Sequence, residues 1–242
     1  MKLQFKIDKK YLLAHALWRN TMPFPGWDNL KNYLWQESIL GYQFLTGLPE
    51  AFLQFNKTSE IIKEGDKLYK KALKRKEFKR LLAETKKYRQ WLEKEWHKNE
   101  KKILSWVKEL SGLKISDKTI TVFVTHPKFN NGKSLAEKDI ILWGHPEDWK
   151  NYSLVYLTHE LLHLLTKKCK KPFTMHALIE LLADNEVRSR LNGGGVYFRE
   201  GKHSVGHPYL AKLEKKILPQ WKKFVKDRRG KNLFWLEKRV KI

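Results

Sequence analysis

The chain has 242 residues, 41% of them hydrophobic and 13% aromatic, so it can bury a core and fold as one large or two modest domains. It has no apolar run of about 18 residues and no apolar stretch near its N-terminus, so we expect neither a membrane span nor a signal peptide. The single cysteine, Cys169, rules out an internal disulfide framework and fits a reducing compartment. These features predict a cytoplasmic protein.

The charge is strongly unbalanced. Fifty Lys and Arg residues against 26 Asp and Glu residues give a formal net charge of +24. Such a balance favours acidic partners or nucleic acid through long-range steering and counterion release. Lysine greatly outnumbers arginine, however, and lysines on the outer face of amphipathic helices are usually only solvated. The composition is therefore compatible with an acidic partner or nucleic acid, and requires neither.

The first half of the chain is predicted to be helical. Asp8 is placed to cap a helix that ends before the proline-rich "MPFPG", and helical spacing resumes over residues 27–47. Residues 58–112 form a long amphipathic pattern that ends at Gly112. We expect a helical N-terminal region over residues 1–115. Its apolar residues repeat at three-, four- and seven-residue spacings: Tyr88, Leu92, Trp96, Ile103, Val107 and Leu110.

The pattern changes after residue 115. "TITVFVT" (residues 119–125) and "DIILW" (residues 139–143) are β-branched or apolar runs typical of strands, and a loop containing Asn130, Asn131 and Gly132 separates them. We expect an α+β, mostly helical fold, in which residues 116–242 form a domain with a small sheet and a basic C-terminal helix. That helix keeps an apolar stripe of Leu210, Leu213, Ile217, Trp221 and Phe224.

A leucine-rich helix carries three polar side chains. "NYSLVYLTHELLHLL" (residues 151–165) is apolar almost all round, as in a buried helix. His159 and His163 are four residues apart, so their rings can share one metal ion. Glu160 lies about 100° further round the helix, from where it can reach a metal-bound water. This spacing predicts a zinc site, and the alternative is a hydrogen-bonded polar patch in the core.

A second helix should supply a third ligand. Over residues 173–194, His176, Glu180, Asp184 and Arg188 are spaced by four and form one stripe. His176 and Glu180 are both candidate ligands, and the spacing favours Glu180. Asp184 would then accept a hydrogen bond from the second ring nitrogen of a ligand histidine, or simply pair with Arg188. Cys169 is a poor candidate for a ligand, and Glu186 falls off the stripe.

The two motifs "HELLH" and "ELLAD" together resemble the gluzincins, a clan of zinc metallopeptidases, and look most like HtpX-type peptidases and the small minigluzincins. The similarity covers roughly residues 119–212. It implies a zincin-like domain, a zinc site of His159, His163 and Glu180, Glu160 as general base, and hydrolysis of a peptide or protein substrate. It also implies that "DIILWG" pairs with extended substrate by β-augmentation.

The same resemblance points to a histidine that stabilises the oxyanion. "GHPYLAKL" (residues 206–213) is similar to a His-Pro element of the family, which makes His207 the candidate. Tyr209 and His203 are alternatives, and Tyr197 is a weaker one. The chain departs from HtpX-type enzymes in having no transmembrane segment.

Two other functions remain open. The chain also resembles the SprT-like, DNA-associated proteases, in which a histidine is the third zinc ligand; His176 would then replace Glu180, and the basic surface would bind DNA. A non-catalytic nucleic-acid-binding protein, whose zinc would be structural, is the remaining alternative.

Overall fold

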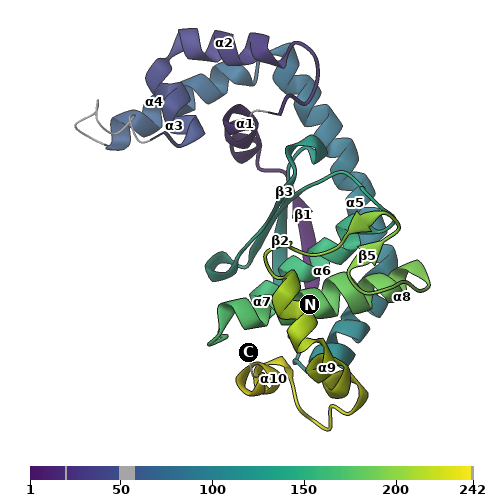
Figure 1. The fold of residues 1–242 in the computed structure, drawn as a ribbon. Helices are drawn as coiled ribbons and strands as arrows, with labels where there is room; N and C mark the ends of the chain where they lie inside the picture. The colour runs from purple at the N-terminus through teal and green to yellow at the C-terminus, as the bar shows by residue number, and fades with distance from the viewer. Residues whose placement is uncertain (20, 49–57, 241–242) are drawn as a thin grey trace.

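The computed structural model describes residues 1–19, 21–48 and 58–240. The chain forms a mostly helical α+β fold around a small mixed sheet, as predicted (Figure 1). The helices, including the 3₁₀ and π segments labelled η, are α1 (Lys9–Trp18), α2 (Trp27–Glu37), α3 (Ile39–Thr46), α4 (Thr58–Ala72), α5 (Lys76–Ser111), η2 (Pro127–Phe129), η3 (Ala136–Lys138), α6 (Tyr152–Leu165), α7 (Pro172–Glu180), η4 (Leu181–Val187), α8 (Arg188–Asn192), α9 (Ala211–Lys226) and α10 (Leu233–Arg239).

Four strands form the main sheet, in the order β1 (Lys2–Lys6), β2 (Thr119–Val124), β4 (Ile140–Gly144) and β3 (Asn131–Leu135). β1, β2 and β4 run parallel, and β3 pairs antiparallel to β4 at the edge. A second, two-stranded sheet joins β5 (Arg199–Glu200) to β6 (His203–Ser204). The expectation that "DIILWG" pairs with substrate is wrong, because β4 is already hydrogen-bonded on both sides and β3 is the edge strand.

The described residues pack into two hydrophobic cores. The smaller core joins α1 to α4 with the first turns of α5 and with Phe129 of η2. The larger core combines the sheet with α6, α7, α9, α10 and the second half of α5. The boundary expected near residue 115 does not coincide with this division, because Leu3, Phe5 and the stretch from Leu92 to Leu113 belong to the larger core.

The 36 residues of α5 connect the two cores (Figure 1). At 1.5 Å per residue the helix is about 54 Å long, so it passes from one core to the other without a break. It ends at Gly112, whose φ of 67° closes the last turn in the left-handed region. The amphipathic pattern over residues 58–112 is divided into α4 and α5 by a turn between Ala72 and Lys76.

Within the described part of the chain, no helix is both long enough and apolar enough to cross a bilayer.

Candidate metal centre

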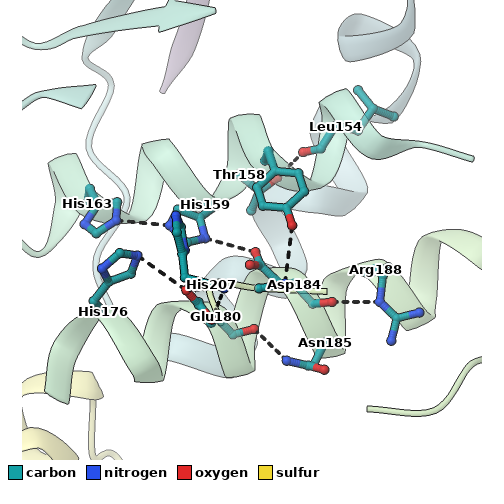
Figure 2. Close-up of polar contacts among 12 residues, drawn as sticks. Leu154, Thr158, His159, His163, His176, Glu180, Asp184, Asn185, Arg188 and His207 are labelled. Carbon is teal, nitrogen blue, oxygen red and sulfur yellow. Dashed lines mark hydrogen bonds and ion pairs between the residues drawn. The ribbon is translucent and has the colours of Figure 1, made fainter. Parts of the chain in front are cut away.

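Helix α6 carries the paired histidines. It packs in the larger core through its leucines, and His159 is only 1% exposed. The one-turn separation brings His159 Nε2 within 3.1 Å of His163 Nε2 (Figure 2). Two nitrogen ligands of a tetrahedral zinc lie about 3.3 Å apart, given Zn–N bonds of about 2.0–2.1 Å. The contact is a direct hydrogen bond between the two rings, and its length is also close to the separation of two ligands of one ion.

Asp184 fixes the orientation of the first histidine. Its Oδ1 lies 3.0 Å from His159 Nδ1, which leaves Nε2 of that ring facing His163. The alternative Asp184–Arg188 ion pair is not formed: Arg188 donates to the backbone oxygen of Asp184 at 2.7 Å, and its guanidinium pairs with Glu200. A carboxylate on the second nitrogen of a ligand histidine selects its tautomer and makes it a stronger ligand.

Glu180 lies fully buried at the end of α7. Both of its carboxylate oxygens accept the backbone N–H of His207, at 3.1 and 3.0 Å, and Oε1 also contacts His207 Nδ1. The neighbouring Gly206 has a φ of +85°, and a Cβ at this position would lie 2.4 Å from Glu180 Oε2. Glycine is therefore required here both by the backbone conformation and by the close approach of the carboxylate.

His176 lies close to His159 and His163, nearer than its position on the second helix suggested. Its ring centroid is 4.6 Å from that of His163 and 5.2 Å from that of His159. Its Nε2 is 3.6 Å from Glu180 Oε1. Ring nitrogens of His159, His176 and His207 also fall within 4.8 Å of one another. Within the described residues, the group whose ligand atoms converge is thus His159, His176 and His207, and the predicted set of His159, His163 and Glu180 does not converge in the same way. Glu180 borders this group through His207 and His176.

The electrostatics leave His163 and His176 neutral near pH 7, and leave His159 protonated while no ion is bound. Burial, followed by the charge of His159, lowers the pKa of His163 to about 2 and that of His176 to about 4, so both rings are neutral. Burial alone would lower the pKa of His159, but the Asp184 carboxylate outweighs it and raises that pKa to about 9. Burial would likewise raise the pKa of Glu180, yet its hydrogen bonds with His207 hold it below the usual value. His163, His176 and Glu180 are therefore in the states in which zinc binds such groups, whereas His159 must release a proton when the ion binds.

Several buried polar atoms at this centre have no protein partner. Within the described residues, His176 Nε2 and Asp184 Oδ2 lack a hydrogen bond although both are inaccessible to solvent. Orphaned polar atoms are costly in a protein interior unless an ion or water satisfies them. Together with the donor set, this fits a bound metal ion.

Glu160 lies beside the edge strand. The side chain is partly exposed, and its Oε1 is 3.9 Å from the point where a Cβ at Gly132 of β3 would sit. Gly132 in turn packs under the ring of Trp143, its partner on β4. The carboxylate therefore stands between α6 and β3, which among the described strands pairs with β4 alone.

The remaining candidates divide by position. The Tyr209 hydroxyl is 3.3 Å from His176 Nδ1, so Tyr209 borders the centre. His203 belongs to the β5–β6 hairpin, and Tyr197 donates a hydrogen bond to Glu186, so neither contacts the histidines. Cys169 lines a cavity of about 200 Å³ that His163 and His176 also line, and burial raises the pKa of its thiol.

Sequence reasoning missed Glu214. This residue of α9 is 1% exposed, and its Oε2 lies 3.7 Å from the Cβ position of Gly206, close to Glu180. Burial and the neighbouring Glu180 and Asp184 raise its pKa to about 9. The signal was present in the sequence, because Glu214 falls on the apolar stripe of α9, three residues before Ile217 and seven before Trp221.

Comparisons with models of known protein families, with characterised proteins and with solved structures find no match to this chain.

Proposed function

We propose that the protein is a zinc metallopeptidase and that its larger core has a zincin-like arrangement. The observation that carries the proposal is the pair of facing ring nitrogens, His159 Nε2 and His163 Nε2, 3.1 Å apart, with Asp184 on the far side of the first ring. An ordinary core patch would not need this whole arrangement, in which a third and a fourth histidine and a buried glutamate border the same space.

His159, His163 and Glu180 are the proposed zinc ligands. Glu180 is favoured over His176 because it is ionised, fully buried and one turn before the aspartate that orients His159. His176 is 19% exposed at its side chain and lies at the rim with Tyr209. A bound zinc supplies an acidified water and polarises the scissile carbonyl.

Glu160 is the proposed general base. It is adjacent in sequence to His159 and projects towards the edge strand, where a substrate carbonyl would be presented. The carboxylate accepts the proton of the attacking water and passes it to the leaving amine. His207, whose side chain is 44% exposed, is the proposed donor of a hydrogen bond to the oxyanion, the negatively charged oxygen that forms from the substrate carbonyl.

The edge strand β3 is the proposed substrate platform. Among the described strands it pairs with β4 alone, so its other edge can accept an extended peptide by main-chain hydrogen bonding. The strand is short and contains Gly132, so a substrate backbone can approach closely beside Glu160. Main-chain recognition predicts activity on unstructured segments rather than on folded domains.

The test combines metal analysis with one isosteric variant. We expect purified protein to contain one zinc per chain and to cleave members of a broad library of unstructured peptides, with loss of activity on chelation. Glu160→Gln should keep the zinc and lose turnover by at least about 10²-fold, the usual contribution of a general base. Normal turnover in Glu160→Gln would remove the proposed base, and zinc-free, inactive wild-type protein would remove the proposal.

A SprT-like, DNA-associated protease is the second candidate, because His176 does lie among the centre's ring nitrogens. This candidate differs from the first in its third zinc ligand, which is His176 in place of Glu180, and in its activity, which would require DNA.

A further inference from the structure

A surface cavity of about 460 Å³ lies at the C-terminal end of the chain, between the last turns of α9 and helix α10. Trp235 forms part of its wall, and four cationic side chains line it: Lys223, Arg229, Lys231 and Arg239. We call this the C-terminal cavity. It belongs to neither the histidine cluster nor the edge strand, and the proposed peptidase reaction does not use it.

The cavity is strongly cationic. Its one acidic lining residue, Asp227, is held by Arg229 at 2.6 and 2.8 Å. The Lys231 ammonium and the Arg239 guanidinium lie 4.6 and 4.3 Å from the Trp235 ring centroid. Four positive charges and one negative charge leave a net +3 around an aromatic ring. Such a site suits an anion that also carries a flat aromatic group.

The positive surface continues from the cavity towards the candidate metal centre. Glu237, the acidic residue of α10, is buried and accepts the backbone N–H of Lys170 at 2.7 Å. This contact holds the loop between α6 and α7 against α10, and Figure 1 shows α10 next to the start of α7. The loop and its exposed lysines therefore lie next to α10, which carries Lys238 and Arg239. We call the set the basic band: Lys168, Lys170, Lys171 and Lys238, together with the four cations of the cavity.

Solvated lysines alone do not explain this arrangement. Over residues 206–240 there are eleven Lys and Arg residues and three acidic residues, and two of these acids, Glu214 and Glu237, are buried. The surface of α9 and α10 is thus nearly free of negative charge. A partner with regularly spaced anions gains from such a surface by releasing its counterions.

We propose that the basic band and the C-terminal cavity bind single-stranded nucleic acid, with phosphates along the lysines and one base in the cavity against Trp235. An acidic peptide would use the same charges, but it carries a flat group only where its sequence has an aromatic residue, whereas every nucleotide joins a phosphate to a flat base. A duplex keeps its bases stacked inside, where they cannot enter it. The proposal stands independently of peptidase activity.

The first experiment measures binding of a fluorescent oligodeoxythymidine of about 20 nucleotides by anisotropy, over a series of salt concentrations. The variant Arg229→Gln, Lys231→Gln, Arg239→Gln removes three charges from the cavity. We expect at least tenfold weaker binding at low salt. The magnitude of the slope of log K against log salt should also fall by about 2. Each phosphate contact on a single strand contributes about 0.7 to this slope, and the variant loses three such contacts.

The matched control removes three exposed charges from α5, with Lys86, Lys94 and Lys98 all changed to glutamine. We expect the control to bind within about twofold of the wild type, because long-range attraction alone is weakly sensitive to three distant charges. Equal losses in the two triple variants would overturn the proposal, since they would show binding to the general positive charge rather than to this site.

A second pair of variants tests the aromatic part. Trp235→Leu should weaken binding about tenfold, and Trp235→Phe should restore most of it, because stacking is worth about 1–3 kcal/mol per base. If Trp235→Leu does not fold, the triple variant and Trp235→Phe still decide the matter. Displacement of the oligonucleotide by poly-glutamate as effectively as by unlabelled oligodeoxythymidine would contradict the proposal and identify an acidic polypeptide as the ligand.

Discussion

The carboxylate of Asp184 faces His159, although Arg188 lies one turn further along the same stretch of helix. Arg188 is diverted because its guanidinium is held by Glu200 and by the backbone oxygen of Val196 at 2.7 Å. The two residues thus serve different parts of the fold. Asp184 orients a ligand-competent ring, and Arg188 ties the loop before β5 to the helix.

Replacing Asp184 by asparagine should weaken zinc binding by about 10–100-fold, the usual effect of losing such a partner. The amide keeps the shape of the side chain but loses the charge that stabilises the N–H of His159. Competition with a chromophoric chelator measures the affinity. The control is Glu186→Gln. Glu186 is an acidic residue of the same segment and contacts Tyr197, so its replacement should leave the zinc affinity unchanged. Equal affinities for wild type and Asp184→Asn would show that this carboxylate does not support a ligand.

Glutamine variants of Glu180 and His176 distinguish the two ligand sets. If Glu180 is the third ligand, Glu180→Gln should lose most of its zinc, while His176→Gln keeps one zinc per chain and changes activity less than tenfold. The reason is that an ionised carboxylate contributes far more to zinc affinity than its neutral amide. Elemental analysis after dialysis gives the stoichiometry. The reverse pattern would favour the SprT-like arrangement with His176.

Gly206→Ala should disturb the centre without changing any polar group. Its Cβ would meet Glu180 Oε2 at 2.4 Å, so the carboxylate or the His207 loop must shift. Gly201→Ala is the matched control, because Gly201 also has a positive φ, +57°, but no atom lies within 4 Å of its Cβ position. Both variants carry backbone strain of about 1 kcal/mol, and we expect only Gly206→Ala to weaken zinc binding as well. Urea unfolding and zinc titration together separate the two effects, and indistinguishable variants would argue against a close contact at Glu180.

His15 should make the smaller core sensitive to acid. Burial, and then the charge of Arg19, lowers its pKa from 6.5 to about 4. The unfolded chain therefore binds the proton more readily, and stability falls as the pH drops from about 6.5 to about 4, by about 2 kcal/mol for a partly solvated ring. His15→Phe preserves the contact with Phe129 and removes the titration. We expect the urea midpoints of the two proteins to diverge between about pH 7.5 and pH 5, and parallel midpoints would show that His15 titrates normally.

The sequence predicted the elements whose periodicity is long and unambiguous. Asp8 caps α1, α3 ends at Gly47, α5 ends at Gly112, and α6 carries both histidines on one face, all as expected from local patterns. The Asp184–His159 contact was one of two alternatives that the spacing left open, the other being a pair with Arg188, and the structure forms the first.

The strands at the two edges of the sheet were not predicted. β1 is only five residues long and lies at the N-terminus, and its alternation of exposed and buried residues needs the distant β2 as a partner. β3 consists of Asn-Gly-Lys-Ser-Leu, residues that favour turns, and becomes a strand only because β4 lies beside it. The same limitation produced the wrong assignment of β4 as the substrate-pairing strand. Long-range pairing is not encoded in local periodicity.

The position of His176 was difficult to judge for a related reason. Its spacing from Glu180 shows that the two share a face, but not how closely that face approaches α6. That distance depends on the crossing of two helices, which is set by the packing of the core. Likewise, nothing local indicated that the loop containing Gly206 would bring the backbone N–H of His207 to Glu180.

The π-helical segment η4 follows Glu180 directly, and Asn185 Nδ2 bonds to the backbone oxygen of Glu180 across it at 3.0 Å. Wider turns of this kind contain more residues per revolution than an α-helix. The angular offset between Glu180 and Asp184 therefore depends on the number of residues in this segment. Deleting one amino acid there would allow regular α-helical winding, with the following residues close to their present register, and it would disturb the bond between Asn185 and the Glu180 carbonyl. The length of this one segment thus sets how Asp184 and Asn185 stand relative to Glu180.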